Sequence, residues 1–330
     1  MRKVLLTMEN RGYNYSVILE YLNEKGFSAD WKPITTGKPE EIIEKARGYD
    51  AVIAGVEKWS REAMSEVRNS VRIIARYGIG YDSVDLDAAT EFGIAVTNTP
   101  GTMSGGVAEL AMQFMLNLSR KTCEFNHRLK SGQWWQGYTG IQLEGKTVGI
   151  IGFGHIGRKL AKYLQGFSCN ILVYDKYVDS KALKELSAEY ASLDDIAHKS
   201  DYISLHAPAT DETRGMINEA FLLKMKPTAF LINTSRGALV KEEDLIYALQ
   251  QGIIAGAGLD VFEKEPLSFD HPILKLDNVI VTPHIASATI EGAREAGICA
   301  ADNIIDLFQR RQPRNLLNSA LSLNLVFERL

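Results

Sequence analysis

The 330-residue sequence is poor in cysteine and contains no long apolar run. Its three cysteines, Cys123, Cys169 and Cys299, form no CxxC pair, so we expect neither a disulfide framework nor a thiolate metal site. They should instead pack as small apolar residues. The apolar runs are far shorter than the roughly 20 residues of a membrane-spanning helix. With no signal-peptide pattern at the start, the sequence predicts a cytoplasmic protein with no membrane segment and no metal.

The sequence also has no large excess of basic or of acidic residues. There are 37 basic and 41 acidic residues, a formal net charge of -4, so neither a nucleic acid nor a membrane surface is indicated as a partner. We find no internal repeat and no low-complexity segment. A chain of this length exceeds what one hydrophobic core usually serves, so two domains are expected.

β-prone apolar segments alternate with helical patterns along most of the chain, which is typical of parallel sheets covered by helices. The pattern breaks at Pro100-Gly101, a candidate hinge, and a long helix with one apolar face follows from Val107. The sequence thus predicts an α/β protein with two doubly wound parallel-sheet domains. One comprises residues 1–98 plus 290–330 and the other residues 99–289. Trp134 and Trp135 are either interface anchors or core residues.

The clearest motif is Gly152-Phe153-Gly154-His155-Ile156-Gly157, which lies between an apolar strand and a helical pattern. In a dinucleotide site, Gly152 permits the tight turn, Gly154 lets the backbone approach the pyrophosphate, and Gly157 allows close packing of helix on strand. The helix N-terminus then offers N–H groups to the phosphates. Asp175, at the end of the next strand, can accept from the ribose hydroxyls and favours NAD over NADP. The alternative is a glycine turn that binds nothing.

Three charged or titratable residues follow the ends of later strands: Arg236, Glu265 and His284. Reduction of a ketone by a nicotinamide leaves negative charge on oxygen, so the site needs a proton donor and a fixed cation. Histidine suits the proton transfer, a glutamate against its other ring nitrogen fixes the tautomer, and arginine can hold a carboxylate. Individually, each could be an ordinary loop residue.

A second glycine turn, Gly78-Ile79-Gly80, also follows a predicted strand. Its backbone N–H groups could hold a small anion at the carboxyl end of a sheet. An ordinary strand-to-helix turn is the equally simple alternative.

The combination of motifs resembles the D-isomer-specific 2-hydroxyacid dehydrogenases, including their phosphoglycerate dehydrogenase-like and glyoxylate-hydroxypyruvate reductase-like members. The resemblance rests on segments in family order: RYGIGYDSVDLDAA, VTNTPGTMSGGVAELA, GKTVGIIGFGHIG, HAPATDETRGMIN, LINTSRGALV, GAGLDVFEKEP and VTPHIASAT. It implies a flavodoxin-like substrate domain, a Rossmann NAD-binding domain, an active site in the cleft and domain closure on binding. It also implies a homodimer, with a dimerisation segment at about 103–145.

Carried over motif by motif, the resemblance makes His284 the acid/base, Glu265 its support and Arg236 a substrate-binding catalytic residue. Gly78, Ile79 and Gly80 would bind the substrate carboxylate. The implied cofactor contacts include Gly152, Gly154, His155, Ile156, Gly157 and Asp175, and further along Val107, His206, Pro208, Thr213, Thr234 and Asp260. Asp260 would meet the nicotinamide carboxamide, Val107 would pack near the nicotinamide, and His206 would line the adenine side.

The expected activity is reversible hydride transfer between NAD(H) and a small 2-oxo or 2-hydroxy acid. Met103 stands where many relatives carry Asn, and Gln136 stands where a phosphate-binding member might place a basic residue. Both departures weigh against a phosphorylated substrate. Three alternatives stay open: a 3-phosphoglycerate dehydrogenase, a phosphite oxidoreductase, and a non-catalytic NAD-sensing corepressor.

Overall fold

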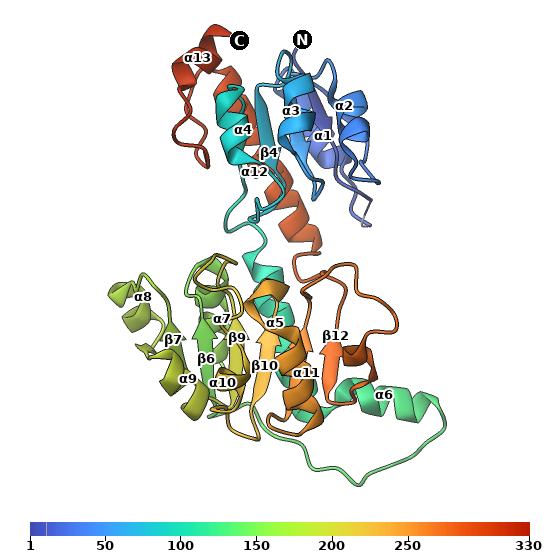
Figure 1. The fold of residues 1–330 in the computed structure, drawn as a ribbon, viewed down its shortest axis with the longest axis vertical. Helices are drawn as coiled ribbons and strands as arrows, with labels where there is room; N and C mark the ends of the chain where they lie inside the picture. The colour runs from blue at the N-terminus through green and yellow to red at the C-terminus, as the bar shows by residue number, and fades with distance from the viewer. Residues whose placement is uncertain (11) are drawn as a thin grey trace. The chain divides into compact units, whose positions relative to one another are not determined.

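The computed structural model describes residues 1–10 and 12–330, and the chain divides into two units (Figure 1). Unit 1 comprises Met1–Met103 and Ala288–Leu330, and unit 2 comprises Ser104–Ser287. The chain therefore passes between the units at 103/104 and 287/288, whereas the sequence suggested 98/99 and 289/290.

The segment expected to act as a hinge is hydrogen-bonded into unit 1. The Asn98 N–H donates to the Asn315 carbonyl at 3.4 Å, and the Thr99 N–H donates to the Gly78 carbonyl at 3.0 Å. The backbone thus stays attached to unit 1 up to the Pro100-Gly101 turn, and the first helix of unit 2 begins only at Ser104.

Unit 1 is a parallel sheet with helices on both faces. In sheet order its strands are β2 (Ser28–Trp31), β1 (Lys3–Leu6), β3 (Ala51–Ala54), β4 (Ile73–Arg76) and β5 (Ala95–Thr97). One face is covered by α1 (Ser16–Glu24), α12 (Ile290–Phe308) and α13 (Leu323–Glu328). The other is covered by α2 (Pro39–Ala46), α3 (Arg61–Val67) and α4 (Leu86–Glu91). This strand order is the flavodoxin-like one, as expected.

Unit 2 is a larger parallel sheet of the same layered kind. In sheet order its strands are β12 (Val279–Val281), β11 (Gly256–Leu259), β10 (Phe230–Asn233), β9 (Tyr202–Leu205), β6 (Thr147–Ile151), β7 (Asn170–Tyr174) and β8 (Ala188–Tyr190). Helices α5 (Ser104–Arg120), α7 (His155–Gln165) and α8 (Ser180–Glu185) cover one face. Helices α9 (Leu193–Lys199), α10 (Glu219–Leu222) and α11 (Glu242–Gln250) cover the other.

The strand order of unit 2 reverses between β6 and β9, which pair side by side from Val148↔Tyr202 to Ile151↔Leu205. This is the Rossmann arrangement, and ligands of such sheets bind beyond the carboxyl ends of the strands at the reversal. Most of the central strands read as apolar runs because both faces of the sheet are buried. The predicted fold class, two doubly wound parallel-sheet domains, is confirmed.

The burial of two tryptophans and of the cysteines differs from the expectations. The tryptophans after α6 (Thr122–Lys130) are exposed, Trp134 at 78% and Trp135 at 45%, so the core interpretation was wrong. Cys123 is also exposed and the other two cysteines are half-buried, so they do not pack as core residues. No helix of the described chain, residues 1–10 and 12–330, is long and apolar enough to cross a membrane.

Candidate active site

The glycine motif turns tightly from β6 into α7. Gly152 has φ +98°, and a Cβ there would lie 2.5 Å from the Ala207 nitrogen. A Cβ on Gly157 would lie 2.2 Å from the Gly152 carbonyl oxygen. Gly154 differs, because a Cβ there would meet nothing within 4 Å. Two glycines therefore permit close packing, and the third leaves open space above the helix N-terminus.

Helix α7 begins at His155 with Gly154 as its N-cap and without a side-chain cap. The first N–H groups of a helix have no partner within the helix, and with the positive end of the dipole they suit a phosphate. His155 is exposed and Ile156 half-buried at this end. The turn thus has both the space and the donors that a pyrophosphate requires.

Asp175 follows β7 and is fixed by two backbone donors. Its Oδ2 accepts from the Phe153 N–H at 2.6 Å and its Oδ1 from the Tyr177 N–H at 2.9 Å. The neighbouring Lys176 is paired with Glu212 at 2.7 Å. A carboxylate at this position, with the nearest lysine already paired, favours a ribose hydroxyl over a 2′-phosphate.

Two buried polar atoms at the carboxyl edge of the sheet lack a hydrogen-bond partner within the described chain: Nδ1 of His206 and Oγ1 of Thr234. Burial lowers the pKa of His206 to about 3, so the ring is neutral, and its Nε2 lies 2.9 Å from the Ser204 hydroxyl. Such orphaned groups are uncommon in folded proteins, and a bound ligand is one way to satisfy them. The exposed Pro208 accepts from Thr213 Oγ1 at 2.6 Å. These residues fit a dinucleotide.

His284 and Glu265 form a close pair. His284 Nδ1 lies 2.7 Å from Glu265 Oε2, and Glu265 Oε1 accepts from the Phe262 N–H at 3.0 Å. Burial alone would raise the pKa of Glu265, but the hydrogen bonds from His284 and Phe262 and the charges of His284 and Arg236 hold that pKa below its usual value. The glutamate is therefore an anion that orients the ring through Nδ1, and Nε2 has no hydrogen bond among the described residues.

The backbone of His284 is in the left-handed region, with φ +52°. Such a conformation costs about 1–3 kcal/mol and persists only where the surroundings fix it. Here Asp260 fixes it: its carbonyl accepts from the His284 N–H at 2.8 Å, and its carboxylate accepts from the Ile285 and Ala286 N–H groups, both at 2.8 Å. Thr282 Oγ1 donates to the same carboxylate at 2.5 Å.

Asp260 is fully buried and both of its oxygens are engaged in this way. It therefore positions the His284 loop, a role that sequence reasoning missed. The only signal was an acidic residue in an otherwise apolar strand end. Its implied contact with the nicotinamide carboxamide stays a prediction.

Arg236 ends the loop after β10 and starts the 3-10 turn η1 (Gly237–Leu239). Its side chain donates to the Ser235 carbonyl at 2.8 Å, and its own carbonyl accepts from Asn233 Nδ2 at 2.9 Å. A Cβ on Gly237 would lie 1.9 Å from the Phe262 carbonyl carbon, so only glycine lets this loop pack on the next one. The three predicted catalytic residues thus come together from the loops after β10, β11 and β12.

The Gly78-Ile79-Gly80 turn lies in unit 1, after β4. Gly78 has φ +132°, and its N–H already donates to Thr99 Oγ1 at 2.9 Å. In the described chain the Ile79 and Gly80 N–H groups donate to no protein acceptor. Ile79 and Gly80 are therefore the better candidates for binding an anion. Val107 is buried on α5 of unit 2.

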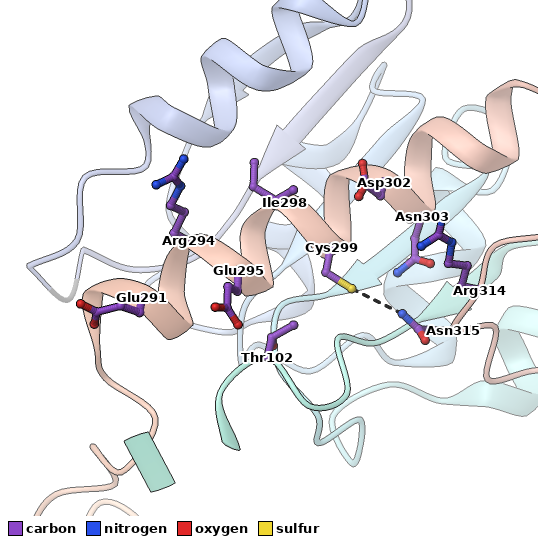
Figure 2. Close-up of a pocket in the computed structure, with 10 residues that line it drawn as sticks. All are labelled: Thr102, Glu291, Arg294, Glu295, Ile298, Cys299, Asp302, Asn303, Arg314 and Asn315. Atoms are coloured by element: carbon purple, nitrogen blue, oxygen red, sulfur yellow. Dashed lines mark hydrogen bonds between the residues drawn. The ribbon is translucent and has the colours of Figure 1, made fainter. Parts of the chain in front are cut away.

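A pocket of about 650 Å³ opens along α12 in unit 1, lined by one side of that helix with Thr102, Arg314 and Asn315 (Figure 2). Asn315 Nδ2 donates to Cys299 Sγ there at 3.4 Å. None of the predicted catalytic or cofactor residues lines it. The pocket is thus separate from the chemistry described above.

Known proteins with similar sequences identify the family of this chain. Residues 112–286 match the model of the D-isomer specific 2-hydroxyacid dehydrogenase, NAD binding domain. A glyoxylate reductase from Thermococcus litoralis is 42% identical over 296 residues, covering 87% of this chain and 89% of the relative. The chain belongs to the D-2-hydroxyacid dehydrogenase family.

Other members of the family carry different names. A D-3-phosphoglycerate dehydrogenase from Archaeoglobus fulgidus is 35% identical, covering 91% of this chain and 57% of that protein. The apo structure of D-lactate dehydrogenase from Escherichia coli superposes with a TM-score of 0.81 at 31% identity, covering 96% of this chain and 100% of that one. The chain is thus an NAD-dependent D-2-hydroxyacid dehydrogenase, an oxidoreductase acting on a CH–OH group, and the D-2-hydroxyacid dehydrogenase resemblance read from its motifs is confirmed.

Proposed function

We propose that this D-2-hydroxyacid dehydrogenase reduces a small, unphosphorylated 2-oxo acid with NADH, with His284 as the acid/base. The observation that carries the proposal is the 2.7 Å pair of His284 and the ionised Glu265. It is supported by the glyoxylate reductase name of several relatives near 40% identity.

The contacts described above support the following residue roles. When bound, NADH supplies the hydride. His284 gives a proton from Nε2 to the substrate oxygen as the hydride adds to the carbon. Glu265 holds the ring in place through Nδ1 and stabilises its protonated form before the transfer. Arg236 provides the permanent positive charge for the substrate carboxylate or carbonyl. The Ile79 and Gly80 N–H groups bind the carboxylate of the substrate.

The cofactor roles rest on the same geometry. The Gly152–Gly157 turn and the N-terminus of α7 hold the pyrophosphate, and Asp175 binds the ribose. His206, Pro208 and Thr213 line the adenosine side, whereas Thr234, Asp260 and Val107 serve the nicotinamide side. The roles of the domains belong to the proposal as well: unit 1, which the sequence bounded at 1–98 with 290–330, binds substrate, and unit 2, which it bounded at 99–289, binds the dinucleotide.

The proposal is tested by NADH consumption with glyoxylate, hydroxypyruvate, pyruvate and 3-phosphohydroxypyruvate, and by NAD reduction with phosphite. Turnover of an unphosphorylated 2-oxo acid supports it. A marked preference for the phosphorylated acid would make the chain a phosphoglycerate dehydrogenase, and activity with phosphite alone would make it a phosphite oxidoreductase. Tight NADH binding without any turnover would favour the corepressor-like role.

We also propose a homodimer formed through residues 103–145. Helix α6 has no buried residue, and α6 with the long loop after it projects beyond the layers of unit 2 (Figure 1). Leu129, Trp134 and Trp135 leave 56%, 78% and 45% of their surface exposed. Large apolar side chains exposed together mark an interaction surface, and a second copy of the chain is the partner we assign.

The proposed location of the protein is the cytoplasm. Its three free cysteines support this, because thiols stay reduced there.

Sedimentation or size-exclusion measurements test the dimer. Trp134→Ser should shift the protein toward the monomer mass. Phe269→Ser, at a 99% exposed aromatic residue outside this segment, is the matched control and should not. A monomeric wild-type protein would contradict the proposal.

A further inference from the structure

Glu57 is a buried carboxyl group in unit 1 that has no ion-pair partner among the residues that the structure describes. Its exposed fraction is 7%, and in the described chain no Lys, Arg or His forms an ion pair with it. One oxygen, Oε1, accepts from three neutral donors: the Thr7 hydroxyl, the Gly55 N–H at 3.1 Å and Trp59 Nε1 at 3.1 Å. Buried charges are normally paired, because desolvation makes an isolated one costly.

The second oxygen of Glu57 is left open. Oε2 accepts no hydrogen bond within residues 1–10 and 12–330. It is not one of the fully buried polar atoms without a partner, so part of its surface is accessible to solvent. A Cβ on Gly55 would lie 2.7 Å from Oε2, so the glycine leaves room for the carboxylate. Three bonds to Oε1 therefore fix the group and present Oε2 as a rigid acceptor.

The loop that carries Glu57 is hydrogen-bonded to the loop that carries the anion-binding candidates of unit 1. The loop after β3 is tied to the loop after β4 at both ends: the Tyr77 N–H donates to the Ala54 carbonyl at 2.9 Å, and the Trp59 N–H donates to the Ser83 carbonyl at 2.8 Å. Between these ties, one loop carries Glu57 and the other carries Gly78-Ile79-Gly80. Both lie beyond the carboxyl ends of adjacent parallel strands, where ligands of such sheets bind.

We propose that Glu57 selects the group on the third carbon of the substrate, accepting a hydrogen bond from a hydroxyl and excluding an anion there. This inference rests on the proposed function and specifies its substrate class: 2-oxo acids with an uncharged, hydrogen-bond-donating substituent, of which hydroxypyruvate is the simplest. An alkyl group would bury Oε2 without a partner, and a phosphate would bring like charges together.

The wild-type enzyme alone gives the first test. Hydroxypyruvate and 2-oxobutyrate carry a hydroxymethyl and an ethyl group of equal heavy-atom number, and 3-phosphohydroxypyruvate adds an anion. We expect kcat/KM for hydroxypyruvate to exceed that for each of the other two by at least about tenfold, since a site built to bond a hydroxyl rejects analogues that lack it. Equal use of 2-oxobutyrate or of the phosphorylated acid would overturn the proposal.

The second test is Glu57→Gln, which keeps an acceptor for the three donors and removes the charge. Use of 3-phosphohydroxypyruvate relative to hydroxypyruvate should rise by at least about tenfold, because the like-charge repulsion is gone. The preference for hydroxypyruvate over 2-oxobutyrate should fall, since charged acceptors make the stronger bonds. Glu62→Gln, at an exposed glutamate of α3, is the matched control and should change neither ratio.

The outcomes separate the two claims. Unchanged ratios in a folded Glu57→Gln variant would refute the role of Glu57 and leave the proposed function intact. If the variant does not fold, as judged by circular dichroism, the wild-type ratios decide. A wild-type enzyme without turnover of any 2-oxo acid would overturn the proposed function and the role of Glu57 together.

Discussion

His284 is the residue whose replacement tests the proposed chemistry most sharply, and its backbone determines which replacement to use. Its φ of +52° is tolerated by Asn, which is enriched in the left-handed region, and strained for Ala. General acid–base catalysis contributes about 10²–10⁴ to the rate. At about 1.36 kcal/mol per factor of ten, this corresponds to about 2.7–5.4 kcal/mol of transition-state stabilisation. We therefore expect His284→Asn to lower kcat by at least about a hundredfold.

Stopped-flow or steady-state NADH oxidation measures this loss, and fluorescence titration measures NADH binding, which should be almost unchanged. His284→Ala should lose as much turnover and also unfold more readily, because a Cβ in the left-handed region costs about 1–2 kcal/mol without a compensating side chain. Near-normal turnover of His284→Asn would remove His284 from the mechanism. Equal loss of NADH binding would show a disrupted fold instead.

Two further predictions concern the cofactor turn and the glutamate. Gly157→Ala should abolish NADH binding or folding, because its Cβ would lie 2.2 Å from a backbone oxygen. Gly154→Ala should fold normally and weaken NADH binding alone. Calorimetry on both variants measures this difference. The lowered pKa of Glu265 means that its ionised form stabilises the folded state above the unfolded-state pKa of about 4.3, and that this contribution is lost as the pH falls through the folded-state pKa. Thermal unfolding should show wild type more stable than Glu265→Gln at neutral pH and no longer so in acid; a constant difference would contradict the assignment.

The sequence predicted best those features that are local. The Gly152–Gly157 turn has its strand, helix and acidic residue within one continuous stretch of sequence. The role of each glycine could therefore be predicted before its contacts were known. The residues after β10, β11 and β12 were also predictable as a group, because parallel strands place their carboxyl ends on one edge.

Features that depend on distant contacts could not be predicted. Asp260 holds the His284 loop across more than twenty residues of sequence, and Glu57 contacts Thr7, which lies 50 residues earlier in the chain. Nothing in the local pattern distinguishes either from an ordinary acidic residue. The exposure of Trp134 could not be predicted either, because tryptophan is common in protein cores and only the structure shows that 78% of this residue is exposed.

The most direct test of the whole account is the configuration of the product. The wild-type enzyme is incubated with NADH and hydroxypyruvate, or with pyruvate, and the glycerate or lactate formed is resolved into its enantiomers. We expect the D isomer alone. The L isomer, a racemate, or no hydroxy acid at all would contradict the assignment of this chain as a D-2-hydroxyacid dehydrogenase acting on small 2-oxo acids.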